Sequence, residues 1–150
     1  MRVLFCHGKE GNPNGTKAMK IREAFTTAVI PRLTNSYEAV DFKNDLAIVQ
    51  ALAKGADVLV GSSRGGALVC QADTTQRKVV IAPAWKKFAV DPKLTDRDVI
   101  IHSENDDIVP ISDSKELADR FGCRLITCGN DHRMSGEEAL EQIKLAIAGE

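Results

Sequence analysis

The chain has 150 residues, enough for one domain with a single hydrophobic core and too few for an additional lid domain. Its 20 basic residues nearly balance its 21 acidic ones, and aromatic residues are sparse, so neither a basic face nor a base-stacking surface indicates nucleic acid. No apolar stretch approaches the roughly 18 residues that span a membrane, and the amino terminus shows no signal-peptide pattern, so we expect a cytoplasmic protein.

The first predicted strand covers residues 2–6 and leads into a loop, residues 7–11, that reads HGKEG. A phosphate-binding loop is one interpretation, because the segment is rich in glycine and a helix follows it. The sequence contains neither G-x-x-x-x-G-K-[ST] nor G-x-G-x-x-G, which disfavours that interpretation.

Three more elements are predicted before the next motif. Apolar residues recur at helical spacing over residues 16–29 and predict a helix there. A short strand is expected over residues 37–42. Asn44 then caps a second helix, which Gly55 ends.

The most informative motif, residues 61–65, reads G-S-S-R-G and follows the apolar run 57–60. A helix-compatible stretch comes directly after it. In this context G-x-S-x-G forms a nucleophile elbow, a strained turn that pushes the serine hydroxyl clear of the sheet. The two glycines remove side chains that would collide as strand and helix close around the serine. The motif therefore predicts Ser63 as the nucleophile of a serine hydrolase.

A fourth strand is predicted over residues 78–82, and the connecting segment 84–96 follows it. Trp85 has two open interpretations: it lines an acyl pocket, or it packs a short connecting helix together with Phe88. The two lysines after Trp85 either attract an anionic leaving group such as coenzyme A or form only a solvated face.

After a fifth predicted strand, segment 102–110 reads HSENDDIVP. It resembles the H-G-x-x-D-x-x-V-P segment of the α/β-hydrolase superfamily, with Ser103 in place of the glycine. The register of that pattern selects Asp106 as the catalytic acid and leaves Asp107 as a solvated or helix-terminal charge. His102 is interpreted as a structural residue of this segment.

The last predicted strand covers residues 123–128, and His132 follows in the next loop. Of the three histidines, only His132 lies downstream of both Ser63 and Asp106, as the order of this architecture requires. Its ring must reach the serine hydroxyl on one side and the carboxylate on the other. The sequence therefore predicts His132 as the general base.

Six predicted strands alternate with helices, which predicts an α/β fold with a doubly wound, mostly parallel six-stranded sheet and helices on both faces. Over essentially its full length the chain resembles a minimal α/β hydrolase of the small, lidless bacterial esterase and thioesterase type. It starts at the strand that carries the oxyanion loop, without the two antiparallel strands that many members place before it. The resemblance rests on the His7-Gly8 loop, Gly61 to Gly65, Asp106 with Val109-Pro110, and Asp131-His132-Arg133.

The resemblance also implies an oxyanion hole formed by the backbone N–H groups of Lys9 and Arg64. In related serine enzymes each such donor contributes about 3–4 kcal/mol to the stability of the transition state. A charged residue at position 9 departs from the family pattern, as Ser103 does, but the main chain makes the contact.

The four cysteines lack C-x-x-C spacing and mostly sit in apolar segments, so we expect reduced, buried thiols. Histidines and cysteines are scattered without ligand spacing, so we expect no metal site. Members of the family that the chain resembles use no cofactor.

The expected reaction is cleavage of a small carboxylic ester or acyl thioester through an acyl-enzyme on Ser63. With no lid to bury a long chain, short to medium acyl groups are favoured. Two alternatives stay open: the same triad cleaves amides or carbon–carbon bonds, or the domain is a binding protein that kept the fold and lost turnover. The intact order of the triad disfavours the last alternative, because folding does not require all three residues.

Overall fold

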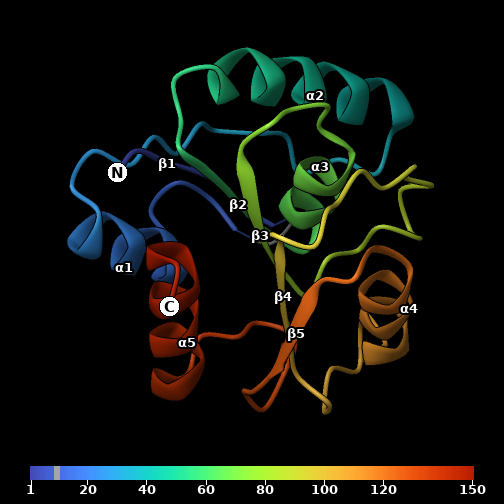
Figure 1. Cartoon of the computed structure of the whole chain (residues 1–150). Helices are drawn as coiled ribbons and strands as arrows, with labels where there is room; N and C mark the ends of the chain where they lie inside the picture. Colours follow the sequence, from blue (N-terminus) through green and yellow to red (C-terminus); the bar gives the residue numbers. More distant parts are fainter. Residues whose placement is uncertain (9–10) are drawn as a thin grey trace.

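Five parallel strands form the central sheet of the structure, a computed structural model that describes residues 1–8 and 11–150 (Figure 1). They pair in sequence order, β1-β2-β3-β4-β5. Because all strands are parallel, their carboxyl ends meet at one edge of the sheet, where ligands bind in folds of this kind. The strands are β1 (Val3–Cys6), β2 (Val58–Ser62), β3 (Arg77–Ile81), β4 (Val99–His102) and β5 (Arg124–Thr127).

Helices cover both faces of this sheet. On one face, α1 (Thr16–Ala24) and α5 (Glu137–Ala148) lie side by side (Figure 1). On the other face lie α2 (Ala39–Ala53), α3 (Arg64–Gln71) and α4 (Ile111–Phe121). Alternate strand residues divide between the two layers, since strand side chains point to opposite faces in turn. The predicted α/β architecture with helices on both faces is confirmed.

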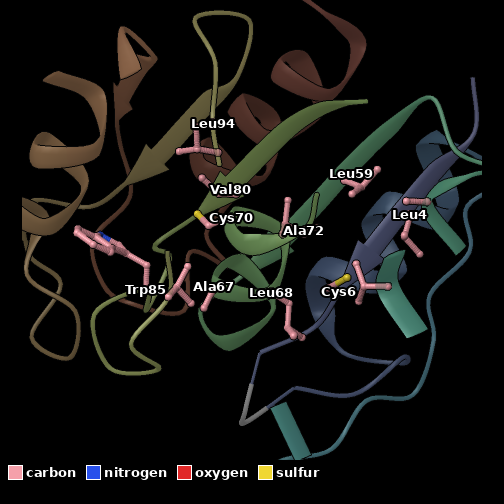
Figure 2. Packing of buried hydrophobic residues seen from close by; sticks show 14 of the residues in the cluster. Leu4, Cys6, Leu59, Ala67, Leu68, Cys70, Ala72, Val80, Trp85 and Leu94 are labelled. Carbon is pink, nitrogen blue, oxygen red and sulfur yellow. The ribbon is translucent and has the colours of Figure 1, made fainter. Parts of the chain in front are cut away.

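The larger apolar cluster fills the layer between the sheet and α3. Figure 2 shows strand residues such as Leu59 and Val80 facing α3 residues such as Leu68 and Cys70. All four of these side chains are 0% exposed. Helix α3 is therefore fixed against the sheet directly behind the turn that carries Ser63, which gives that turn a rigid support.

The prediction of a strand over residues 37–42 is wrong, and the sheet has five strands instead of the six predicted. Helix α2 starts at Ala39, and Phe42, Val49 and Ala53 lie on its buried face at helical spacing. Asn44 consequently lies inside the helix and does not cap it. Helical periodicity over a long segment overrides the short apolar run at its start.

A strand-like segment occurs earlier, at Val29, beside the outer edge of β1. The Val29 N–H donates to the carbonyl of Val3, and the Phe5 N–H donates to the carbonyl of Val29. The helix predicted over residues 16–29 ends at Ala24 for this reason. Extended backbone is natural here, because β-branched residues favour it and Pro31 disfavours helix in the residue before it.

The position of Val29 explains how the sheet is doubly wound. From β1 the chain passes through α1 to Val29 on one side of β1, and then returns through α2 to β2 on the other side. The direction of winding reverses at β1, so the loop after β1 opens at the topological switch point, where ligands bind in such sheets.

Candidate active site

Ser63 forms the turn between β2 and α3 and has backbone angles φ 55° and ψ −112°. A non-glycine residue at positive φ is strained and persists only where its surroundings hold it. Three hydrogen bonds do so: the Ser63 N–H donates to the Ile81 carbonyl at 2.9 Å, and the Ser63 carbonyl accepts from the N–H groups of Ala67 and Ala84, both at 3.0 Å. The turn is thus tied to α3 and to β3 together with the segment that follows it.

The two glycines of the motif allow the close packing behind this turn. A Cβ at Gly61 would lie 2.2 Å from the carbonyl oxygen of Gly65, and a Cβ at Gly65 would lie 2.0 Å from that of Cys6. Real Cβ atoms do not approach backbone so closely. The start of α3 therefore crosses β1 and β2 at a distance that only glycine permits.

His132 lies in the loop after β5 and contacts both of the other predicted residues. Its Nε2 is 2.9 Å from Ser63 Oγ, and its Nδ1 is 2.7 Å from Asp106 Oδ2. A carboxylate only accepts, so Nδ1 carries the proton and Nε2 is left to accept from the serine hydroxyl. The structure thus brings Ser63, His132 and Asp106 into one hydrogen-bonded chain, although 26 to 69 residues of sequence separate them.

Asp106 follows β4, and its side chain is completely buried. Its Oδ1 accepts the N–H groups of Ile108 and Val109, both at 2.8 Å. Burial by itself raises the pKa of Asp106, but the hydrogen bonds from His132 and from these two N–H groups outweigh it and hold the pKa below its usual value. Asp106 is therefore ionised at neutral pH. Its neighbour Asp107 is exposed to solvent.

Arg64 is the first residue of α3, where backbone N–H groups have no partner within the helix. Its side chain points away from Ser63 and forms a buried ion pair with Asp45 of α2, with 2.7 Å between Nη1 and Oδ2. Only the main chain of Arg64 is thus available to a substrate on Ser63, as an oxyanion-hole donor requires.

Lys9, the other predicted donor, lies outside the described residues, so its role stays a prediction. The preceding Gly8 is described, and a Cβ there would lie 3.2 Å from both Ser63 Cβ and the Ser62 carbonyl oxygen. Gly8 therefore lies directly beside the candidate nucleophile.

His7 connects the end of β1 to the segment that contains Leu33. The Leu33 N–H donates to His7 Nε2 at 3.0 Å, so the proton of the ring is on Nδ1, which donates to the Gly8 carbonyl at 2.9 Å. Burial lowers the pKa of His7, which keeps the ring neutral. This role of His7 could not be predicted from the sequence, because Leu33 lies in a segment without recognisable pattern.

Trp85 lies within the core cluster and is 8% exposed, and its indole N–H donates to the Asp113 carbonyl of α4 at 3.0 Å (Figure 2). This burial agrees with the packing interpretation, although the segment around Trp85 forms turns and no helix. A role for Trp85 in an acyl pocket stays a prediction. Lys86 pairs with Asp113 at 3.4 Å and with Glu116 at 3.2 Å. Lys87 lies over the ring of Tyr37. Both lysines are thus engaged by neighbouring side chains.

In the described part of the chain no group of three or more His, Cys, Asp or Glu side chains is arranged to hold a metal ion. None of the described helices combines the length and apolar character needed to cross a membrane.

No family model and no curated protein matches the sequence. Solved structures do match. A candidate hydrolase of the alpha/beta superfamily from Xanthomonas campestris superposes with a TM-score of 0.83 at 20% identity, over 99% of each chain. Alpha/beta hydrolase domain-containing protein 10 from mouse gives 0.76 at 18% identity, over 98% of this chain and 88% of the mouse chain.

Est1E from Butyrivibrio proteoclasticus also gives a TM-score of 0.76, at 17% identity over 98% of this chain and 86% of its own, and it has been solved with ferulic acid bound. The chain therefore has the α/β-hydrolase fold, as its motifs predicted.

Proposed function

We propose that this protein is a serine hydrolase that cleaves carboxylic esters or acyl thioesters through an acyl-enzyme on Ser63. The observation that carries the proposal is the hydrogen-bonded chain from Ser63 Oγ through His132 to Asp106, with distances of 2.9 and 2.7 Å. It starts at a serine in the strained elbow conformation, where a hydroxyl is presented at the carboxyl edge of the sheet.

In the proposed reaction His132 Nε2 takes the hydroxyl proton as Ser63 Oγ attacks the carbonyl carbon of the substrate. Asp106 stabilises the imidazolium that forms and does not itself take a proton. The carbonyl oxygen becomes an oxyanion beside the backbone N–H of Arg64, with Lys9 N–H as the second proposed donor. Nothing in this step needs a metal or an organic cofactor.

The tetrahedral intermediate then collapses. The bond to the leaving alcohol or thiol breaks, and the leaving group takes the proton from His132. A water molecule, deprotonated by the same imidazole, attacks the acyl-enzyme and releases the carboxylic acid and free Ser63. Each proton that His132 accepts in the first half of a step is returned in the second half.

Two features support an ester or thioester as substrate. Among the structures that share the fold, Est1E has been solved with ferulic acid, an aromatic carboxylic acid, bound. The connecting segment after β3 forms short turns and packs into the core through Trp85. We propose short to medium acyl groups for that reason.

The test is hydrolysis of p-nitrophenyl esters from acetyl to palmitoyl by the wild type and by Ser63→Ala. We expect turnover with a short-chain or medium-chain optimum, and a loss of at least about a thousandfold in kcat for the variant. The matched control is Ser62→Ala, which removes a buried hydroxyl one residue earlier and should keep most of the activity.

Labelling with a fluorophosphonate probe separates catalysis from binding. The probe should phosphonylate Ser63 in the wild type with loss of fluoride, and it should leave Ser63→Ala unlabelled. A folded wild-type protein that neither reacts with the probe nor hydrolyses any ester, thioester or amide would contradict the proposal and favour a binding protein.

A further inference from the structure

Asp106 contacts a second histidine besides His132. His102, the last residue of β4, is 0% exposed, and its Nε2 lies 3.0 Å from Asp106 Oδ2 and 2.9 Å from the Val109 carbonyl oxygen. Its other nitrogen, Nδ1, lies 2.6 Å from the hydroxyl of Ser114 on α4. Both ring nitrogens are thus engaged, and the ring orientation is fixed from two sides.

The partners determine where the ring proton is. A backbone carbonyl only accepts hydrogen bonds, so His102 Nε2 carries the proton and donates to both Val109 and Asp106. Nδ1 is then an acceptor, and the Ser114 hydroxyl donates to it. Burial lowers the pKa of His102, against the opposing effects of the Val109 carbonyl and Asp106. The ring is therefore neutral at neutral pH and presents a donor without a second positive charge.

We propose that His102 is a positioning residue for the candidate triad: its Nε2–H holds the Asp106 carboxylate in place and takes up part of the negative charge that faces His132. The inference rests on the proposed function, since it assigns His102 a part in that reaction. The carboxylate is then held by four donors, His102 and His132 at Oδ2 and the Ile108 and Val109 N–H groups at Oδ1.

Packing alone does not explain this residue. An aliphatic side chain would fill the same volume without burying polar atoms, and burying a polar ring is unfavourable unless its hydrogen bonds are made. Here they are made to the candidate acid and to a serine of α4. The arrangement links α4 through Ser114, His102, Asp106 and His132 to Ser63, in one continuous series of hydrogen bonds.

The charge effect has a definite sign. A donor on Asp106 Oδ2 weakens the attraction between the carboxylate and a protonated His132. Without His102 the carboxylate pairs more strongly with the imidazolium, so the acid limb of the kcat/KM pH profile moves to higher pH. Among the described residues, Asp131 and Arg133 flank His132 in its own loop, and Lys17 of α1 donates to the Arg133 carbonyl. These stay constant in the comparison.

The test compares His102→Leu, which removes the donor, with His102→Gln, whose side-chain amide can donate from nearly the same place. For His102→Leu we expect kcat to fall about 10-fold to 100-fold, because a hydrogen bond to a charged group is lost. KM should stay unchanged, and the acid limb should shift upward. His102→Gln should recover most of kcat and the wild-type acid limb. Equal losses in both variants, or a wild-type pH profile in His102→Leu, would overturn the proposal.

A second readout needs no substrate. In the 15N-labelled wild type, the two imidazole N–H protons donated to Asp106 should give protected, downfield NMR signals. His102→Leu should lose one and move the other, His132 Nδ1–H, further downfield. If the two signals change in this way but neither the wild type nor any variant hydrolyses a substrate, the positioning role is supported and the proposed function is contradicted. If hydrolysis depends on Ser63 but the His132 signal does not move in His102→Leu, the proposed function is supported and the positioning role is contradicted.

Should His102→Leu fail to fold, Ser114→Ala provides the test. It leaves His102 in place and removes only the hydrogen bond that orients the ring. A smaller shift of the acid limb and of the His132 signal in the same directions is expected, and no shift in either would overturn the proposal.

Discussion

At the scale of single residues, Gly65 carries the tightest constraint on the site. A methyl group there would meet the backbone carbonyl of Cys6 at 2.0 Å, and backbone cannot move aside as a flexible side chain can. We expect Gly65→Ala to lower the free energy of unfolding by about 3 kcal/mol or more, because β1 and α3 must separate. Urea unfolding measures this loss, and ester hydrolysis should fall with it because Ser63 moves with α3.

The matched control is Gly55→Ala, where the new methyl group would lie 3.8 Å from its nearest neighbour, an ordinary contact. That variant should unfold within about 0.5 kcal/mol of the wild type, as is usual for surface substitutions. Similar stability losses in the two variants would show that close packing behind the elbow is not what requires Gly65.

The sequence predicted Ser63, Asp106 and His132 individually, since each stands in a recognisable loop after a predicted strand. It did not predict that Asp106 is shared between His132 and His102. That contact depends on how the loop 103–109 folds back over the end of β4, and local sequence patterns do not specify such a return. Trp85 stayed ambiguous for the same reason, because an aromatic side chain serves a core or a pocket equally well.

At the scale of elements, a buried ion pair joins the start of α3 to α2. The Arg64 guanidinium contacts Asp45 at 2.7 Å, donates to the Ser36 carbonyl and the Thr34 hydroxyl, and lies 5.4 Å from the centre of the Phe42 ring. Arg64→Met should cost about 3–5 kcal/mol of unfolding free energy, because it leaves Asp45 charged and buried without its cation.

A double-mutant cycle with Asp45→Asn tests this explanation. The amide keeps an acceptor for Thr34 and carries no charge, so Arg64→Met with Asp45→Asn should be more stable than Arg64→Met alone. Strictly additive losses would mean that the contacts of Arg64 with the aromatic rings, and not its charge, stabilise the junction between the two helices.

The element boundaries show where sequence patterns were sufficient. β2, α3 and the elbow between them were predicted correctly, because an apolar strand, two glycines and a helical stretch agree with each other. The segment between α1 and α2 was not: Val29 pairs with β1 in a single bridge, too short for a strand pattern, and residues 37–42 belong to the approach and first turn of α2. The number of strands in the sheet was wrong as a consequence.

At the scale of the whole molecule, alternation of strands and helices was enough to predict the fold class, and the likeness to solved structures confirms it at identities of only 20% or less. In this chain strands alternate with helices, and the direction of winding reverses at β1. The order of the strands follows from those features, because short parallel crossovers favour neighbouring strands.

The buried thiols predict how the whole fold responds to alkali. Burial raises the pKa of Cys6 and of Cys70 to about 12, from 9.0. Between these values the unfolded chain loses the thiol protons while the folded protein keeps them. The contribution of the two thiols to the unfolding free energy is therefore fully present below pH 9 and is lost as the pH rises towards 12. Lys17, whose pKa is lowered to about 8 mainly by burial, has the opposite effect between pH 8 and 10.5.

Comparing variants removes the contribution of the lysine. Urea unfolding in the presence of a reductant, repeated from pH 8 to pH 11, should show a shallower decline for Cys70→Ala than for the wild type. Val69→Ala is the control: it also removes buried volume from α3 but keeps every thiol, so its unfolding free energy should be lower by a constant amount at each pH. If the three curves were parallel, ionisation of Cys70 would not contribute to alkaline unfolding, and the decline would have to come from other groups.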